Sequence, residues 1–204
     1  RFKDRTCNLS DNATDTITLD DSSPDTMPPT GTITINSGLQ YATSTSVTLS
    51  LSATDSSGVT EMQFSNDNSA WSAAEPYATS KAWTMDSADG TKTVYVKYKD
   101  TVGNWTSTEI SDTIILDTIA PSGIADINSG ALTTSSTTVT LTLSASDSGS
   151  GVVSMKFSND GASWSYFEVY GTSKVWTLTS GNGLKTVYVC FEDTAGNWIN
   201  SITD

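Results

Sequence analysis

The side chains with the clearest capacity for chemistry are aspartates that recur in short, matching motifs. Asp55 in ATDSSG corresponds to Asp147 in ASDSGSG, and Asp100 in YKDTVGN corresponds to Asp193 in FEDTAGN. Calcium takes six to eight hard oxygen ligands, and carboxylates are prominent among them. Asp also forms turns by accepting hydrogen bonds from its own backbone. The motifs are therefore compatible with calcium sites and with purely structural turns.

The composition argues against several other kinds of chemistry. The 204 residues include no His, which removes the commonest general base and the commonest transition-metal ligand. The carboxylates recur with a repeat instead of marking one unique cleft, so we expect no enzyme activity. With 10 basic and 23 acidic residues, the net charge of −13 argues against nucleic acid, whose phosphates need a basic surface. No apolar run approaches the roughly 20 residues of a membrane helix, so we expect no membrane insertion.

The elements that position these aspartates are evident from an internal repeat. The segment PTGTITINSGLQYATSTSVTLSLSATDSSGV, which begins at Pro29, is matched by PSGIADINSGALTTSSTTVTLTLSASDSGSGV, which begins at Pro121. Further along, MQFSNDNSAWS is matched by MKFSNDGASWS, and GTKTVYVKYKDTVGNW by GLKTVYVCFEDTAGNW. The opening segments RFKDRTCN and TDTITLD align with the end of the same unit. They predict that the chain begins within a third copy.

These matches predict the domain organisation. Residues 1–20 are the C-terminal strands of a preceding repeat, and residues 21–29 are a linker. One repeat spans 30–117, a short linker spans 118–121, and a second repeat spans 122–204 without its last strand. Two interpretations stay open. The chain is a segment of a longer tandem array, or its first residues complete the open domain of the next molecule by strand complementation and build a filament.

Within each repeat, apolar residues alternate with Ser and Thr, as β-strands require. SVTLSLSAT places Val47, Leu49 and Leu51 on one face, and TVTLTLSAS repeats this pattern. About seven short strands are predicted per repeat of about 90–95 residues, which is typical of a β-sandwich. The fold class is therefore all-β: tandem immunoglobulin-like (fibronectin III-like) seven-stranded β-sandwiches. In the first repeat we expect strands near residues 31–36, 46–54, 58–65, 70–73, 81–85, 92–99 and 111–117.

The motifs DTIAPSG, LSASDSGSGV, FSNDGASW, TVYVCFEDTAGNW and SDTIILD resemble tandem bacterial Ig-like repeats of large extracellular, adhesin-type cell-surface proteins. The resemblance covers essentially the whole chain. It implies a location outside the cell, on its surface or secreted, and a role as a stalk or spacer. Some bacterial Ig-like adhesins are stiffened by calcium at their domain junctions, so the resemblance supports calcium as a cofactor. It carries little information about activity, because such repeats serve mainly as stalks and spacers and function is added to such folds separately.

The geometry of the sandwich predicts where the aspartates meet. The loop between the second and third strands and the loop between the sixth and seventh strands lie at the end where the linker enters. Linker carboxylates should therefore approach loop carboxylates of the following domain, and together they could supply half of a calcium shell. The candidate ligands are Asp20, Asp21, Asp25, Asp55 and Asp100 at the first junction, and Asp117, Asp147 and Asp193 at the second.

The tryptophans allow two roles. Trp83 and Trp176 fall on the fifth strand of each repeat and are predicted to fill the core. Trp105 and Trp198 follow the VGN and AGN turns. An exposed Trp can stack on a sugar ring, but recurrence at one place in both repeats favours packing at the junction.

The sequence thus predicts a non-enzymatic extracellular stalk of tandem Ig-like domains within a longer surface protein. Its partners would be neighbouring Ig-like domains of the same chain or of adjacent subunits, with a glycan or cell-surface ligand as a further candidate. Two alternatives stay open: an extracellular filament assembled head-to-tail by strand complementation, and an accessory carbohydrate-binding array of a secreted enzyme.

Overall fold

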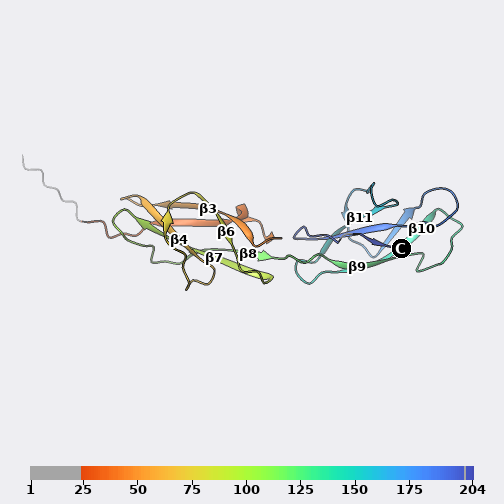
Figure 1. Ribbon diagram of the computed structural model, residues 1–204, viewed down its shortest axis with the longest axis horizontal. Helices are drawn as coiled ribbons and strands as arrows, with labels where there is room; N and C mark the ends of the chain where they lie inside the picture. The colour runs from red at the N-terminus through yellow and green to blue at the C-terminus, as the bar shows by residue number, and fades with distance from the viewer. Residues whose placement is uncertain (1–23, 200) are drawn as a thin grey trace, which may run out of the picture.

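The computed structural model describes residues 24–199 and 201–204, and it confirms the predicted all-β fold. Two β-sandwiches lie end to end along the long axis of the molecule (Figure 1). The predicted tail of a preceding repeat, residues 1–20, and the first part of the predicted linker lie outside the described residues. Within the described ranges, no helix is long and apolar enough to cross a membrane.

The first sandwich packs a three-stranded sheet against a five-stranded sheet. The strand orders are β1-β3-β6 and β2-β8-β7-β4-β5. All neighbouring strands run antiparallel except β2 and β8, which are parallel. A short 3₁₀ helix, η1 (Asn36–Gly38), follows the first strand. The strands are β1 (Thr30–Ile35), β2 (Tyr41–Ala42), β3 (Ser46–Thr54), β4 (Val59–Ser65), β5 (Glu75–Pro76), β6 (Ser80–Thr84), β7 (Gly90–Asp100) and β8 (Ile110–Leu116).

The second sandwich repeats this plan with sheets of three and four strands. The strand orders are β13-β10-β9 and β12-β11-β14-β15, and all described pairings are antiparallel. The strands are β9 (Ser122–Ile127), β10 (Thr138–Ser146), β11 (Val152–Ser158), β12 (Glu168–Val169), β13 (Ser173–Thr177), β14 (Tyr188–Asp193) and β15 (Ile202–Thr203).

The cores consist of the apolar side chains that alternate along the strands. Leu49 at the centre of β3 and Leu141 at the centre of β10 are both 0% exposed, while the Ser and Thr between the apolar positions face the solvent. Burying one such leucine side chain contributes roughly 1.5–3 kcal/mol to the free energy of folding. Each sandwich has its own cluster of buried side chains, so each has its own core.

The prediction for Trp83 and Trp176 is confirmed, because both pack against the core of their sandwich. Each also has a polar partner. The indole Nε1 of Trp83 donates to Asn66 Oδ1 at 2.7 Å, and that of Trp176 donates to Asn159 Oδ1 at 2.8 Å. A half-buried indole N–H thereby stays hydrogen-bonded, which removes the cost of burying it.

The prediction of a strand near residues 70–73 is wrong. The structure places no strand at residues 70–73, and the short strand β5 follows them at Glu75–Pro76. The reason is a turn closed by Asp67, whose Oδ1 accepts the backbone N–H groups of Ser69 and Ala70, both at 2.8 Å. A chain folded back by these hydrogen bonds cannot extend along β4 until the turn has ended.

At one end of the first sandwich the loop after β3 meets the loop after β7, and at the same end of the second sandwich the loop after β10 meets the loop after β14. In the first sandwich, the backbone N–H of Thr101 donates to the carbonyl of Gly58 at 3.1 Å, and Thr194 donates to Gly151 at 3.0 Å in the second. β8 ends at Leu116 and β9 begins at Ser122, so the linker enters the second sandwich beside these joined loops. The fold therefore brings linker and loop residues together.

Candidate metal centres at the linkers

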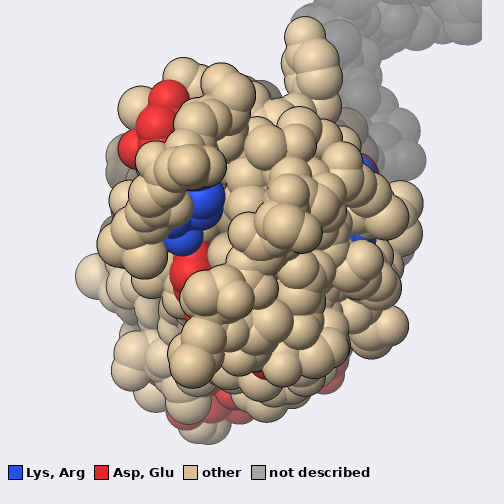
Figure 2. Space-filling view, turned by 90° about the vertical axis from the view of Figure 1, so that its right-hand side faces the viewer, with Lys and Arg blue, Asp and Glu red and all other residues tan. Residues whose placement is uncertain are grey.

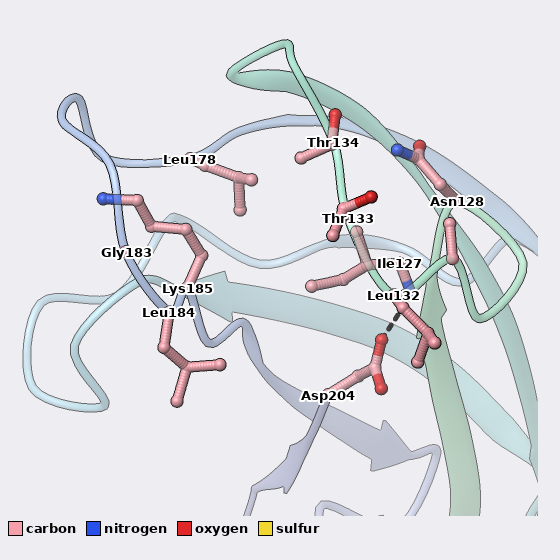
Figure 3. A pocket seen from close by; sticks show the side chains of 11 residues that line it. Ile127, Asn128, Leu132, Thr133, Thr134, Leu178, Gly183, Leu184, Lys185 and Asp204 are labelled. Atoms are coloured by element: carbon pink, nitrogen blue, oxygen red, sulfur yellow. Dashed lines mark hydrogen bonds between the residues drawn. The ribbon is translucent and has the colours of Figure 1, made fainter.

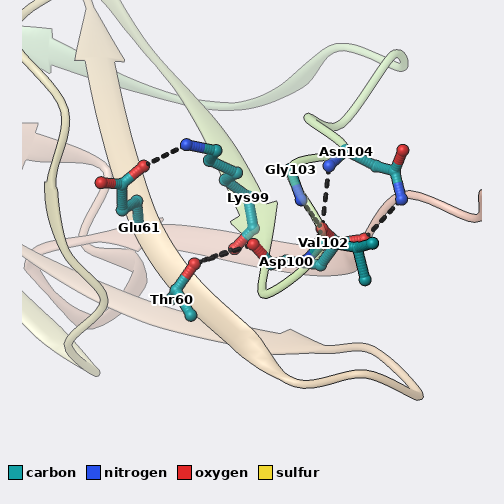
Figure 4. A network of polar contacts seen from close by, with 7 residues as sticks. All are labelled: Thr60, Glu61, Lys99, Asp100, Val102, Gly103 and Asn104. Carbon is teal, nitrogen blue, oxygen red and sulfur yellow. Dashed lines mark hydrogen bonds and ion pairs between the residues drawn. The ribbon is translucent and has the colours of Figure 1, made fainter. Parts of the chain in front are cut away.

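Asp100 at the end of β7 is held by the residues that follow it (Figure 4). Its Oδ1 accepts the backbone N–H groups of Val102 at 2.9 Å, Gly103 at 2.6 Å and Asn104 at 2.8 Å. The side-chain Nδ2 of Asn104 donates to Asp100 Oδ2 at 2.7 Å. Gly103 has a φ of 109°, which glycine adopts readily and which lets the chain curl around the carboxylate. Asp100 is 1% exposed, so the DTVGN motif buries a carboxylate in a defined orientation.

The same network keeps Asp100 ionised. Burial alone would raise the pKa of Asp100, because it disfavours the charged form, but the hydrogen bonds from Asn104, Gly103 and Val102 outweigh it and lower the pKa below its usual range. The carboxylate is therefore in the ionised state that a metal ligand requires.

Figure 4 also shows a contact that anchors this end of β7 to β4: Thr60 Oγ1 donates to the Asp100 carbonyl at 2.8 Å.

Asp193 at the end of β14 repeats this arrangement in the second sandwich. Its Oδ1 accepts the backbone N–H groups of Gly196 at 2.7 Å and Asn197 at 2.8 Å, and its Oδ2 accepts Asn197 Nδ2 at 2.9 Å. Asp193 is also 1% exposed. The DTAGN motif thus builds a buried carboxylate of the same kind.

Asn104 and Asn197 also bind the linkers. Asn197 Nδ2 donates to the carbonyl of Asp117 at 2.9 Å, and Asn104 Nδ2 donates to the carbonyl of Asp25 at 3.0 Å. Each asparagine therefore joins a loop carboxylate to the backbone of the linker. Neither is among the residues predicted to build the junction, although both end the repeated D-T-x-G-N motif that could have pointed to them.

In each sandwich the fold places one linker carboxylate beside two loop carboxylates. One oxygen from each of the three residues lies within 4.8 Å of the others. The first cluster is Asp25, Asp55 and Asp100, and the second cluster is Asp117, Asp147 and Asp193. The other predicted ligands of the first junction, Asp20 and Asp21, lie outside the described residues. An all-oxygen set of this kind suits a hard cation such as calcium better than zinc or copper.

The second cluster contains buried carboxylate oxygens without a partner. Asp117 in the linker is 1% exposed. Its Oδ2 and the Oδ2 of Asp147 are buried, and neither has a hydrogen-bond partner within the described part of the chain. A buried, unpaired carboxylate is costly, and a bound cation would remove that cost. The donor set and its orphaned oxygens therefore fit calcium.

A separate pocket of about 320 Å³ opens at the far end of the second sandwich (Figure 3). Apolar side chains of Ile127, Leu132, Leu178 and Leu184 line it, and Asp204 Oδ2 accepts the backbone N–H of Ile127 at 2.7 Å. Figure 2 views this end of the molecule, where most visible side chains carry no charge.

The first sandwich shows what the corresponding space can hold. Asp112 Oδ2 accepts the backbone N–H of Ile35 at 2.7 Å, which matches the bond from Ile127 to Asp204. The residues after Asp112 continue as β8, and Ile114 and Leu116 are buried there, 2% and 1% exposed. The pocket thus lies beside the position that corresponds to β8 of the first sandwich.

Trp105 and Trp198 pack over lysines of their own sandwich. The ring of Trp105 lies 5.6 Å from Lys99 Nζ, and the ring of Trp198 lies 3.8 Å from Lys156 Nζ. These are cation–π contacts on the face of a sheet. Trp198 remains 49% exposed and also contacts Phe167, with ring centroids 5.6 Å apart. Half of this indole is therefore accessible to a ligand.

Comparison with known proteins informs the fold. No family model matches the chain, and no curated protein matches it. Among solved structures, fibronectin(III)-like modules of CbhA from Clostridium thermocellum are 15% identical, with a TM-score of 0.51 over 84% of this chain and 90% of that chain. Chicken CNTN1 FN1–FN3 domains are 10% identical, with a TM-score of 0.44 over 79% of this chain and 60% of that one. A tetra-tandem repeat from the extending region of a large adhesion protein is 18% identical, with a TM-score of 0.30 over 86% and 48%. The first of these likenesses agrees with the all-β architecture described above: the chain has the Ig-like, fibronectin III-like β-sandwich fold.

Proposed function

We propose that this chain is a non-enzymatic spacer of an extracellular protein, in which calcium at the linkers holds successive β-sandwiches in line. The observation that carries the proposal is the position of Asp117. This linker residue is 1% exposed, its carbonyl accepts a hydrogen bond from Asn197, and its carboxylate clusters with two loop carboxylates of the second sandwich. The linker is thereby embedded in the domain that it precedes.

An embedded linker favours a spacer because it limits the relative motion of the domains. Two domains joined by a free linker reorient readily, and a small interface does little to prevent this. A cation bound by Asp117, Asp147 and Asp193 would attach the linker to both loops at once. Calcium is suited to this role because it accepts six to eight oxygens in a flexible geometry, whereas magnesium demands a near-ideal octahedron.

Two observations support a location outside the cell. The repeat motifs resemble those of bacterial extracellular Ig-like proteins, and the fold is that of fibronectin III-like modules. The net charge of −13 also suits a soluble surface that attracts cations.

Small-angle X-ray scattering of the 204-residue protein, with calcium and with EGTA, tests this function. We expect a longer maximum dimension and a more uniform particle with calcium, and a broader distribution with EGTA. Asp117→Asn should show the broader distribution under both conditions. Identical scattering with calcium and with EGTA, together with identical thermal melting, would contradict the proposal.

A second candidate function is head-to-tail assembly by strand complementation, and the apolar lining of the pocket in the second sandwich favours it. The segment that fills the corresponding space in the first sandwich is DTIILD, residues 112–117, and residues 15–20 read DTITLD. In this alignment, Ile17 and Leu19 correspond to Ile114 and Leu116 of the first sandwich. Sedimentation velocity over a hundredfold range of concentration tests assembly. A single monomeric species at every concentration would exclude it.

Carbohydrate binding is the third candidate, and the half-exposed ring of Trp198 favours it. A glycan array probed with the protein and with Trp198→Ala tests it. Trp105→Ala is the matched variant, because Trp105 occupies the same place in the first sandwich. Absence of binding to every glycan would remove this candidate.

A further inference from the structure

We propose that the two acidic clusters differ in calcium affinity, and that the second cluster binds calcium more tightly than the first. This inference rests on the proposed function, because it assumes that the linker carboxylates bind calcium. It goes further by ranking the two sites and by naming the residues that cause the difference. The argument compares corresponding oxygens in the two sandwiches.

The linker carboxylates differ most. In the first cluster, both oxygens of Asp25 are already engaged: Oδ1 accepts the backbone N–H of Met27 at 2.9 Å, and Oδ2 accepts Ser56 Oγ at 2.8 Å. In the second cluster, Asp117 Oδ1 has one long hydrogen bond from the backbone of Ile119, at 3.3 Å, and Oδ2 is buried with no partner among the residues that the structure describes. A cation must compete with donors at Asp25, whereas at Asp117 it finds an oxygen that has no donor within the described part of the chain.

Asp147 in the loop after β10 and Asp55 in the loop after β3 also differ in their hydrogen bonds. Asp147 Oδ1 accepts three backbone N–H groups, from Gly149, Ser150 and Gly151, each at 2.9 Å. These bonds hold the carboxylate rigidly, and its Oδ2 is buried with no partner in the described ranges. In the first sandwich, Asp55 Oδ1 accepts the N–H and the hydroxyl of Ser57, both at 2.8 Å, and no other donor among residues 24–199 and 201–204. The second cluster is therefore the better preorganised of the two.

The third carboxylate does not distinguish the clusters. Asp100 and Asp193 are both 1% exposed, and each accepts bonds from its own turn and from an asparagine side chain at 2.7 Å and 2.9 Å. The difference in calcium affinity must therefore come from the linker carboxylates and from the loops after β3 and β10.

Loop length explains how the second cluster encloses its linker carboxylate. The first sandwich has two residues between Asp55 and Gly58, whereas the second has three between Asp147 and Gly151. The additional residue brings Gly149 directly against the Asp117 carboxylate, where an added Cβ would lie closer than 3.0 Å to its atoms. The longer loop thus closes over Asp117, and it can do so because Gly149 has no side chain.

The consequence is an ordered response to falling calcium. The first cluster would release its ion at a concentration at which the second cluster still holds one. The linker between the two sandwiches would then stay stiff while the linker that precedes the first sandwich becomes free. A tandem chain with unequal sites would lose its rigidity one junction at a time.

Isothermal titration of the calcium-free 204-residue protein with calcium chloride tests this ranking. We expect two phases whose dissociation constants differ by at least about tenfold. Asp147→Asn should abolish the tight phase, and Asp55→Asn should leave it unchanged. Circular dichroism checks that both variants are folded, and Gly149→Ala gives a second route to the tight site if Asp147→Asn unfolds.

The outcomes separate this inference from the proposed function. Two phases that cannot be distinguished, or loss of the tight phase in Asp55→Asn, would overturn the ranking and leave calcium-dependent stiffening intact. Absence of any calcium uptake by the folded wild-type protein would overturn both.

Discussion

Gly149 lies directly against the carboxylate of Asp117. The two residues come from different elements, the loop after β10 and the linker before β9, and a Cβ on Gly149 would lie closer than 3.0 Å to the Asp117 Cγ and to both carboxylate oxygens. A methyl group at position 149 would therefore force the linker carboxylate away from Asp147 and Asp193. Close packing at this point leaves no space for that methyl group.

Gly149→Ala should weaken calcium binding at the second cluster by about 10- to 100-fold, which is the range found when groups that orient metal ligands are changed. The backbone at Gly149 does not need positive φ, so the effect is steric. Calorimetric titration measures it. Ser148→Ala, at the exposed neighbouring residue, is the matched control and should bind as the wild type does. Equal affinity of Gly149→Ala and wild type would show that the contact with Asp117 has no bearing on the ion.

Asn197→Ala should destabilise the second sandwich by about 1–3 kcal/mol, because it removes a side chain that donates to a buried carboxylate and to the linker carbonyl. Urea unfolding followed by tryptophan fluorescence measures the change. Asn182→Ala in an exposed loop is the control and should stay within about 0.5 kcal/mol of wild type. If Asn197→Ala lowered the unfolding free energy as little as Asn182→Ala does, that result would argue against a structural role for Asn197.

Leu141→Ala should cost about 2–5 kcal/mol of unfolding free energy, since the side chain is fully buried in the core of the second sandwich. Leu49→Ala should have a similar effect on the first sandwich. Thr140→Ala, on the exposed face of the same strand, should change stability by less than about 0.5 kcal/mol. Chemical denaturation of the three variants provides the comparison. Similar costs for Leu141→Ala and Thr140→Ala would contradict the described orientation of β10.

Asp67→Asn should destabilise the first sandwich at neutral pH and have little effect in strong acid. Hydrogen bonds from the backbone of Ala70 and Ser69, and from Ser65, hold the pKa of Asp67 well below its usual range. The folded-state pKa is thus depressed, so the carboxylate stabilises the fold above the unfolded value of about 3.9 and loses this effect as pH falls through the lower folded value.

Urea unfolding at pH 7, 5 and 3 measures this pH dependence. The difference between wild type and Asp67→Asn should be constant between pH 7 and 5 and should start to shrink near pH 3. Asp86→Asn, at an exposed position, is the control. A difference that grows in acid would contradict the assigned hydrogen bonds. Asp160 makes the corresponding turn in the second sandwich and should behave alike.

Much of the fold could be predicted because the relevant signals are local. The alternation around Leu49 and Leu141 defines the strands and their inward faces, and period-two patterns need no knowledge of the rest of the chain. The turn at Asp67 shows where such reasoning fails. Its hydrogen bonds to Ser69 and Ala70 compete with strand pairing, and the apolar pattern does not register that competition.

The sequence was enough to predict which groups of carboxylates form the candidate sites. Recurrence of Asp55 and Asp100 in the second repeat, combined with the position of the linker, was enough to expect linker and loop carboxylates to meet. Asn104 and Asn197 were missed as linker-binding residues, since an asparagine at the end of a turn motif is ordinarily explained by the turn itself.

The amino-acid sequence by itself determined the repeat, the β-sandwich architecture and the carboxylates that could meet, because these follow from periodicity and from motifs that occur twice. Only the tertiary structure decided which carboxylate oxygens have no partner and how deeply the linker is embedded. Asp117, Asp147 and Asp193 come from three segments, and the contact between Gly149 and Asp117 depends on how one loop closes over another. Burial and hydrogen-bond competition at such a meeting point are properties of the assembled fold, which is why two similar motifs can build clusters whose carboxylates have different hydrogen-bond partners.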